Sequence, residues 1–359
     1  MSKFWSPAIQ SLVPYTPGEQ PRVANLTKLN TNENPYPPAP GVSAVLRAFD
    51  YDRLRLYPDP DATPLKAALA AHFGLTRSQV FIGNGSDEVL ALAFMAFFRQ
   101  NKPLLMPETT YSFYDVYANL YGIEHRKVPL DDEFQICLDD YSTDNGGIIF
   151  ANPNAPTGIA LGIDDIEKLL KRNQNSLVLV DEAYVDFGAA SAATLVEQYP
   201  NLLVVQTFSK SRSLAGLRIG YALGHSDLID GLERVKNSFN SYPMDMLAIE
   251  AGCAALADES YFRATCDQIM ATRDHCAQEL AELGFICLPS STNFLFVRHR
   301  YLEAAELMGY LRTHNILVRH FSRPDIANYL RITVGTDDQM ALLISTLEKH
   351  PDIQRLPVS

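Results

Sequence analysis

Lys210 stands shortly after an apolar run, residues 202–206, that is typical of a buried strand. Lysine is seldom buried, and Arg218 supplies a second cation in the same segment. In a dry site near another cation, a lysine loses affinity for its proton, and its amine can form a Schiff base with an aldehyde. The alternative is a surface lysine whose stem covers apolar side chains. The neighbouring motifs decide between the two.

Asp181 follows a second apolar run, residues 177–180, so we expect its carboxylate to be partly buried. A buried carboxylate needs a partner, because desolvating an isolated charge is costly. One interpretation is a counter-ion for the protonated ring nitrogen of a cofactor, with the phenol of Tyr184 at the same ring. A helix cap or an ordinary salt bridge is the alternative.

The segment Gly-Asn-Gly-Ser, residues 83–86, lies between a predicted strand and a predicted helix. Its glycines allow close approach of the backbone, and free N–H groups at the start of a helix suit a phosphate. Thr207, Ser209 and Arg218 could bind the same phosphate. An aldehyde, a phosphate and a basic ring nitrogen together describe pyridoxal 5′-phosphate (PLP). Glu88 occupies the place of the last glycine in the dinucleotide fingerprint, which argues against a nicotinamide-dependent reductase.

These motifs lie on an alternating pattern of strands and helices between residues 41 and 255. Apolar runs that alternate with helices predict an α/β fold with a mainly parallel sheet. Ligands bind such sheets beyond the carboxyl ends of the strands, where the polar residues above are placed. The predicted strands are 79–85, 146–153, 176–184 and 202–210, and the predicted helices are 63–74, with Thr63 as N-cap, and 86–98.

The pattern changes from about residue 256 onward. Helices are predicted at 260–283, 302–313 and 337–349, with short strands between them, which indicates a smaller α+β domain. Residues 1–40 are rich in proline and asparagine and show little periodicity. We therefore predict three parts: an arm, 1–40, that packs on the small domain or on a partner subunit; a large PLP-binding domain, 41–255; and a small C-terminal domain, 256–359.

The composition bounds the function further. The 359 residues carry a net charge of −12, which disfavours binding to a nucleic-acid backbone. The five cysteines are odd in number and lack C-x-x-C spacing, which favours free thiols in a reducing cytoplasm. The sequence has no apolar run long enough to cross a bilayer and no secretion signal. The eight histidines show no ligand spacing, so no metal site is predicted.

Several motifs carry a resemblance to a known family. The segments NPNAPTG (152–158), VDEAYVDF (180–187), TFSKSRSLAGLRIG (207–220) and YLRITVGT (329–336) resemble those of fold-type I PLP-dependent aminotransferases. Within that group, LVPYTPGEQP, KLNTNENPYPP, RLYPDP and GNGSDE are similar to histidinol-phosphate aminotransferases. The resemblance runs in order from about residue 10 to residue 340.

The resemblance implies roles for individual residues. Lys210 matches the lysine that carries the cofactor, Asp181 the partner of its ring nitrogen, and Tyr184 the phenol at its ring hydroxyl. Tyr111 matches the aromatic residue stacked on the ring. Tyr57 matches a tyrosine that reaches the phosphate in the neighbouring subunit, which implies a homodimer with shared active sites. The residues implied around the phosphate are Gly85, Ser86, Asp87, Thr207, Ser209 and Arg218.

The chain departs from the family pattern at Ala155. The family often has an asparagine immediately before Pro-Thr-Gly, where its amide contacts the ring oxygen of the cofactor. Asn154 or Asn152 could take over that contact, or Tyr184 could hold the oxygen alone. We expect the change to tune the rate rather than abolish the chemistry.

The resemblance also implies a substrate site with Tyr15, Asn32, Arg319 and Arg331. In the segment 329–335, period-2 alternation places Arg331 on the face opposite to Leu330 and Ile332. A phosphate monoester carries nearly two charges and should recruit more than one cation, so Arg319 on a neighbouring strand is the expected second.

The activity implied is transamination of histidinol phosphate with 2-oxoglutarate, in which Lys210 moves the proton. An aromatic or broad-specificity aminotransferase is the first alternative, and a PLP-dependent threonine-phosphate decarboxylase is the second. A PLP-binding regulator would need a DNA-binding region, and the chain shows no basic patch for one.

Overall fold

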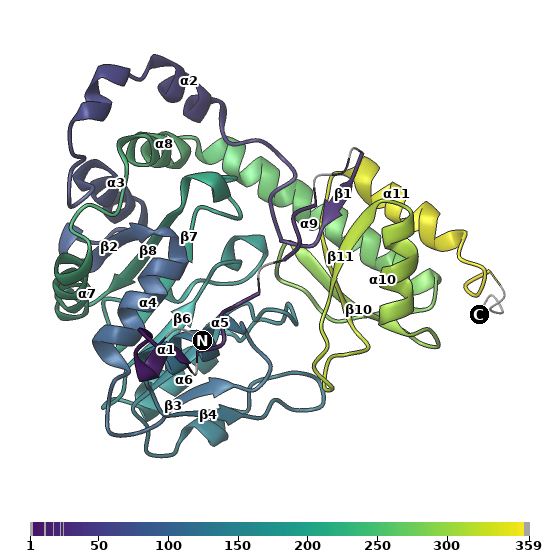
Figure 1. Ribbon diagram of the computed structural model, residues 1–359, viewed down its shortest axis with the longest axis horizontal. Helices are drawn as coiled ribbons and strands as arrows, with labels where there is room; N and C mark the ends of the chain where they lie inside the picture. Colours follow the sequence, from purple (N-terminus) through teal and green to yellow (C-terminus); the bar gives the residue numbers. More distant parts are fainter. Residues whose placement is uncertain (1–2, 11, 17, 22, 24, 355–359) are drawn as a thin grey trace.

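The computed structural model describes residues 3–10, 12–16, 18–21, 23 and 25–354. Within these ranges the strands form two sheets, one of seven and one of five strands. Figure 1 shows the two sheets side by side, with the long helix α9 (Glu259–Glu282) running between them.

The larger sheet has the strand order β2-β8-β7-β6-β5-β3-β4. β8 is antiparallel to both of its neighbours, and the remaining pairs are parallel. Its strands are β2 (Val80–Asn84), β3 (Leu104–Pro107), β4 (His125–Val128), β5 (Gly147–Ala151), β6 (Val178–Asp181), β7 (Leu202–Thr207) and β8 (Ile219–Gly224).

Helices cover both faces of this sheet, because its strands are apolar on both sides. In β7, Leu202 and Val204 join one core with α3 (Thr63–Phe73), α6 (Ile163–Arg172) and α8 (Met246–Ala257). Leu203 and Val205 join the opposite core with α4 (Gly85–Phe97), α5 (Phe113–Tyr121) and α7 (Ser226–Phe239). The period-2 alternation of the strand thus feeds two separate cores.

The smaller sheet has the strand order β1-β11-β12-β10-β9. Its strands are β1 (Thr27–Leu29), β9 (Phe285–Cys287), β10 (Phe294–His299), β11 (Ile316–His320) and β12 (Leu330–Thr333). β1 runs parallel to β11, and the other pairs are antiparallel. Helices α9, α10 (Ala304–Thr313) and α11 (Asp337–Glu348) pack on one face, so the opposite face is left to the cavity described below.

The N-terminal segment links the two sheets. After the short α1 (Pro7–Gln10) it crosses to the edge of the smaller sheet as β1, and it then returns over the larger sheet as α2 (Pro40–Ala48) (Figure 1). The sequence did not predict β1.

The predicted α/β fold, with a mainly parallel sheet and a smaller mixed sheet, is confirmed. One local prediction is wrong. Thr63 is the first residue of α3 rather than its N-cap, and the cap position belongs to Ala62 in a left-handed conformation (φ 46°). The carboxylate of Asp59 accepts the Thr63 N–H at 2.8 Å, so a side chain four residues earlier performs the capping.

None of the described helices is both long and apolar enough to pass through a membrane. The described residues also contain no group of three or more His, Cys, Asp or Glu that could hold a metal ion.

Candidate active site

A cavity lies where the carboxyl ends of the larger sheet's strands, the N-terminal segment and the smaller sheet meet. It is lined by Tyr15, Gly18, Asn30, Thr31, Asn32, Ser86, Asp87, Tyr111, Ala151, Ala155, Asp181, Ala183, Tyr184, Thr207, Ser209, Lys210, Arg218, Arg319 and Arg331. Gly85, Asn154 and Tyr57 are the predicted site residues outside this lining. The cavity brings polar residues from several strand ends of the larger sheet together with residues from near both ends of the chain.

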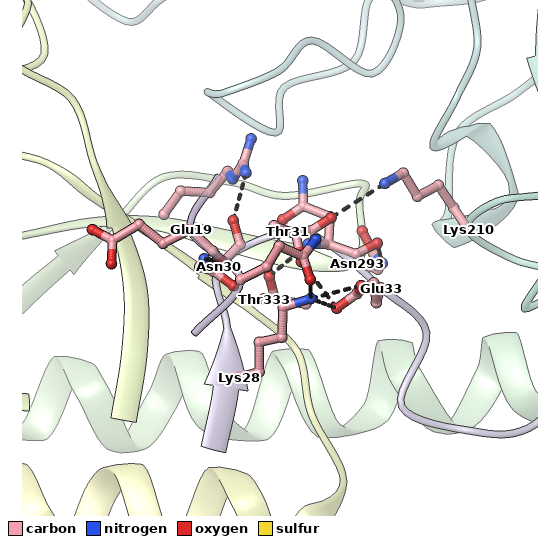
Figure 2. Close-up of polar contacts among 11 residues, drawn as sticks. Glu19, Lys28, Asn30, Thr31, Glu33, Lys210, Asn293 and Thr333 are labelled. Carbon is pink, nitrogen blue, oxygen red and sulfur yellow. Dashed lines mark hydrogen bonds and ion pairs between the residues drawn. The ribbon is translucent and has the colours of Figure 1, made fainter. Parts of the chain in front are cut away.

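Lys210 follows the end of β7 by three residues and reaches into the cavity. Its Nζ donates a hydrogen bond to the Thr31 carbonyl at 3.3 Å and lies 5.7 Å from the centre of the Tyr184 ring. Figure 2 shows the side chain extended toward Thr31. The Asn34 amide donates to the Lys210 carbonyl at 2.9 Å, so the N-terminal segment holds both the backbone and the amine of this lysine.

Asp181 is the last residue of β6, and its carboxylate is buried. The Tyr114 hydroxyl donates to Oδ2 at 2.7 Å, whereas the buried Oδ1 has no hydrogen-bond partner among the described residues. Burial raises the pKa of Asp181 to about 6. The unpartnered oxygen is therefore a strong acceptor for a cationic N–H group placed in the cavity.

A cup for an anion is formed where β2 leads into α4 and β7 is followed by β8. Arg218 donates to Asp87 Oδ2 at 2.8 Å, and Thr207 Oγ1 donates to Ser209 Oγ at 3.0 Å. Two glycines, Gly85 and Gly220, allow the start of α4 to pack closely against Arg218 and β8. A Cβ on Gly85 would lie 2.5 Å from the Arg218 guanidinium, and one on Gly220 would lie 2.2 Å from the Ser86 nitrogen. The first turn of α4 supplies free backbone N–H groups beside these donors.

Tyr111 contributes an aromatic ring to the wall of the cavity. Its hydroxyl donates to Asp87 Oδ1 at 3.3 Å, and its ring meets that of Tyr114 edge-on at 5.5 Å. Burial raises the pKa of Tyr111 well above its ordinary value, so the phenol stays neutral. A neutral aromatic face suits stacking on a flat ligand.

Two arginines form the opposite wall. Arg331 on β12 and Arg319 on β11 are direct partners in the antiparallel pair. Arg331 Nη2 donates to the Asn30 carbonyl at 3.0 Å, while its buried Nε has no partner among the described residues. Burial lowers the pKa of Arg331. No described carboxylate lies within ion-pair distance of either arginine, so this wall presents uncompensated positive charge.

The remaining lining residues come from the N-terminal segment. The ring of Tyr15 packs on Phe113 at 4.7 Å. Asn32 is buried, and its Nδ2 donates to the Tyr184 hydroxyl at 3.0 Å. Asn32, which the sequence assigned to the substrate, thus contacts a residue that the sequence assigned to the cofactor.

Asn154 is not brought into the cavity. Its Oδ1 accepts from Thr110, and its Nδ2 donates to the Thr109 carbonyl and to Thr157. Asn152 is engaged with Leu161 in the same way. The predicted cofactor contact of Asn154 therefore does not hold in this structure, because its amide is saturated by neighbouring groups, and Ala155 lines the cavity instead.

Tyr57 also lies outside the cavity. Its side chain is 80% exposed, and its ring stacks on Tyr242 at 4.8 Å. Within one chain it therefore makes no contact with the site.

Sequence reasoning missed three contributors. Tyr114, which donates to Asp181, lies in the first turn of α5, a helix that was not predicted from the sequence. Thr31 and Asn30 act through backbone carbonyls, which any residue type can supply. No side-chain signal marks them.

Comparisons with known proteins agree with this geometry. The family model for aminotransferase class I and II matches residues 24–347. Histidinol-phosphate aminotransferase from Chromohalobacter salexigens is 60% identical over 348 residues, covering 97% of this chain and 99% of that protein. Histidinol-phosphate aminotransferase 1 from Pseudomonas fluorescens is 56% identical, with 97% and 99% covered.

A solved structure extends the comparison. Histidinol-phosphate aminotransferase from Sinorhizobium meliloti, determined in complex with pyridoxal-5′-phosphate, superposes with a TM-score of 0.88 and 26% identity. The match covers 99% of this chain and 98% of that one. The family predicted from the motifs is confirmed, and the chain belongs to the aminotransferases of class I and II.

Proposed function

We propose that this chain is a histidinol-phosphate aminotransferase that uses PLP and transfers the amino group to 2-oxoglutarate. The observation that carries the proposal is the 60% identity, over nearly the whole of both chains, to a relative of that name. The products are imidazole-acetol phosphate and glutamate, which places the reaction in histidine biosynthesis.

The residues of the cavity fit PLP. The unpartnered Oδ1 of Asp181 would accept the N–H of the pyridine ring, and the cup beside Gly85 would hold the phosphate with Ser86, Ser209 and Arg218. Tyr111 would cover the ring. When bound, the cofactor supplies an electron sink for the carbon that loses its proton.

Asp181 would keep the ring nitrogen of the cofactor charged. Its pKa is raised to about 6 by burial, and a cationic N–H beside Oδ1 counteracts that desolvation. Tyr114 fixes the carboxylate through Oδ2, which leaves Oδ1 directed to the ligand. Tyr184 lies beside Lys210, whose Nζ is 5.7 Å from the centre of the tyrosine ring, and the tyrosine hydroxyl would bind the ring oxygen of the cofactor.

Lys210 is the group that accepts and returns the α-proton of the substrate. The Thr31 carbonyl is a hydrogen-bond acceptor for its amine at 3.3 Å, so it helps to fix the position of the amine. Since a carbonyl only accepts hydrogen bonds, this contact leaves the lone pair of an unprotonated amine free to take up the proton.

Arg331 and Arg319 bind the anionic end of the substrate. Two adjacent guanidinium groups without a carboxylate partner suit the nearly double charge of a phosphate monoester. Tyr15 adds a hydroxyl to this side of the cavity. Asn32 also lines the cavity, with its amide held between Thr333 and Tyr184. The second substrate, a dicarboxylate, can use the same cations.

Exposed apolar residues around Tyr57 support a homodimer. They lie in the segments 51–57 and 239–242, which meet where Tyr57 stacks on Tyr242, and they comprise Tyr51, Leu54, Leu56, Tyr57, Phe239 and Tyr242. Clustered apolar side chains of this kind mark interaction surfaces. In the dimer, Tyr57 would reach the cofactor phosphate of the partner subunit. Sedimentation analysis tests the assembly, and a monomeric active enzyme would contradict it.

We also propose that the three predicted parts, 1–40, 41–255 and 256–359, are the structural units of the chain. All strands of the larger sheet fall between residues 80 and 224, and four strands of the smaller sheet fall between 285 and 333. The five cysteines are free, which supports a cytoplasmic enzyme.

The substrate is tested by mixing the PLP-loaded enzyme with single amines and following the visible absorption of the cofactor. Rapid conversion by histidinol phosphate, with little change on adding phenylalanine, is the expected result. Faster conversion by phenylalanine would point to an aromatic aminotransferase. Release of carbon dioxide from threonine phosphate would point to a decarboxylase.

A further inference from the structure

Ala155 lines the cavity with a methyl group at the position where the family resemblance implies an amide, and Tyr184 lines the same cavity. The amides of Asn152 and Asn154 are engaged with neighbouring groups and do not line the cavity. A ring oxygen in the cavity would therefore depend on the Tyr184 hydroxyl as a donor. Its strength as a donor depends on where its single proton points.

The direction of that proton follows from a chain of hydrogen bonds that starts at a backbone amide. The Asn32 backbone N–H donates to Thr333 Oγ1 at 3.0 Å. The Thr333 hydroxyl is buried, and its own proton goes to Asn32 Oδ1, also at 3.0 Å. Because a backbone N–H can only donate, the polarity of this first link is fixed.

The same polarity continues to Tyr184. With Oδ1 facing Thr333, the other end of the Asn32 amide is the NH2 group, and it donates to Tyr184 Oη at 3.0 Å. Reversing the amide would leave the buried Thr333 proton without an acceptor, which is costly. Tyr184 is therefore an acceptor toward Asn32, and its own proton is free to point elsewhere.

Asn32 is held firmly enough to impose this order. It has a left-handed backbone (φ 55°), which asparagine tolerates better than most residues, and the Asn293 amide donates to its carbonyl at 3.0 Å. Figure 2 shows Asn293 and Thr333 beside the N-terminal segment. The amide is therefore fixed from both the backbone and the side chain.

We propose that Asn32 is a positioning residue that directs the Tyr184 proton into the cavity, and that this contact compensates for Ala155. The inference rests on the proposed function, because its target is the ionised ring oxygen of PLP. Asn32 acts through Tyr184: its amide donates to the phenol oxygen, which polarises the O–H bond and makes it a better donor.

The test is a pH titration of the visible absorption of the PLP-loaded enzyme without substrate. A hydrogen bond donated to the ring oxygen stabilises its anionic form. Loss of the donor therefore raises the pH at which the proton is released from the adjacent nitrogen, the one through which Lys210 holds the cofactor. We expect Asn32→Gly, which tolerates the left-handed backbone, to raise the midpoint by roughly one pH unit. Tyr184→Phe should raise it by at least as much.

The double variant Asn32→Gly/Tyr184→Phe separates positioning from a general structural effect. If Asn32 acts through Tyr184, the double variant should have the same titration midpoint as the single variant Tyr184→Phe. Midpoint shifts that add up would overturn the inference. Thr333→Val, which keeps the Asn32 amide but removes its anchor, should give a smaller shift in the same direction. Asn315→Gly is the matched control, since Asn315 is another left-handed asparagine (φ 60°) and lies outside the cavity lining.

The outcomes distinguish this inference from the proposed function. A wild-type midpoint in Asn32→Gly overturns the inference, even if histidinol phosphate is converted normally. A shifted midpoint supports it, even in an enzyme that prefers another amine. A wild-type protein without a visible PLP band overturns both proposals.

Discussion

The two arginine sites of the cavity differ in what balances their charge. Arg218 is paired with Asp87 at 2.8 Å. Arg331 and Arg319 lie side by side without a carboxylate partner in the described ranges. A cation that is already paired suits a prosthetic group that stays bound, because the site remains ordered when that group is absent. Uncompensated cations suit an anion that must bind and leave in every turnover.

The orphaned atoms show the same division. On the cofactor side, the buried Asp181 Oδ1 has no hydrogen-bond partner among the described residues and can accept from a cation. On the substrate side, the buried Arg331 Nε has none either and can donate to an anion. Buried polar atoms without partners are costly in the free protein. Ligands that supply the missing partners would remove this cost, so an unpartnered acceptor on the cofactor side and an unpartnered donor on the substrate side both favour ligand binding.

The largest effect should come from Lys210→Ala on the cofactor side. Loss of the proton-transferring amine should lower kcat by at least about a thousandfold. The rate of the half-reaction, followed by stopped-flow absorption, measures it. Lys168→Ala, which removes an exposed lysine of α6 paired with Asp165, is the control and should react like the wild type. A Lys210→Ala enzyme within tenfold of the wild type would refute the assignment.

Arg331→Lys should have the next largest effect, on the substrate side. A lysine keeps the charge but cannot bind an oxyanion in a bidentate manner, so KM for the phosphorylated amine should rise roughly 100-fold. Steady-state kinetics measure the change. The dissociation constant for PLP should stay within about threefold of the wild type; an equal rise in both constants would show that the two sides are not separate.

Asp181→Asn, on the cofactor side, should impair the use of the cofactor but stabilise the cofactor-free protein against unfolding. Folded Asp181 has a pKa raised from 3.8 to about 6, so it holds a proton that the unfolded chain releases. Its contribution to the free energy of unfolding therefore falls as pH rises from about 4 to 6. The variant should gain stability over the wild type across this window, on the order of 3 kcal/mol at pH 7.

Urea unfolding of the cofactor-free proteins at several pH values measures this difference. Asp132→Asn, which changes an exposed carboxylate in a turn, is the control. A stability difference that is constant from pH 4 to pH 7 would contradict the account of Asp181.

The smallest effects are expected from two arginine-to-lysine variants, one on each side of the cavity, each measured for both PLP binding and KM. Arg218→Lys should weaken PLP binding only about tenfold, because a lysine can still pair with Asp87. It should leave KM for the amine unchanged, since Arg218 lies on the cofactor side. Arg319→Lys should raise that KM about tenfold and leave PLP binding unchanged. Fluorescence titration with PLP and steady-state kinetics supply the two readouts. An arginine that moves both constants equally would break the comparison.

The sequence was informative where chemistry and burial coincide. Lys210 follows an apolar strand, and Asp181 ends one. The alternation around Arg331 placed it opposite Leu330 and Ile332, which lie in the core of the smaller sheet. These signals are local, because strand pattern alone decides which side chains face a sheet edge or a given face.

The remainder depends on contacts between distant segments. Asn32 meets Tyr184 across 152 positions, and Lys210 meets Thr31 across 179. Nothing in the spacing of these residues predicts their pairing. Asn154 was misplaced because the sequence does not reveal that Thr109, Thr110 and Thr157 already occupy its amide.

The position of β1 has a consequence for biosynthesis. β1 pairs with Ile316–Val318, and Asn32 bonds to Thr333, 301 positions later, so these contacts cannot form until that part of the chain has been synthesised. At about 5–20 residues per second, that delay is roughly 15–60 s. The larger sheet, complete at Gly224, can form in the meantime, while the emerging chain must keep Thr27–Leu29 unpaired and protected from aggregation.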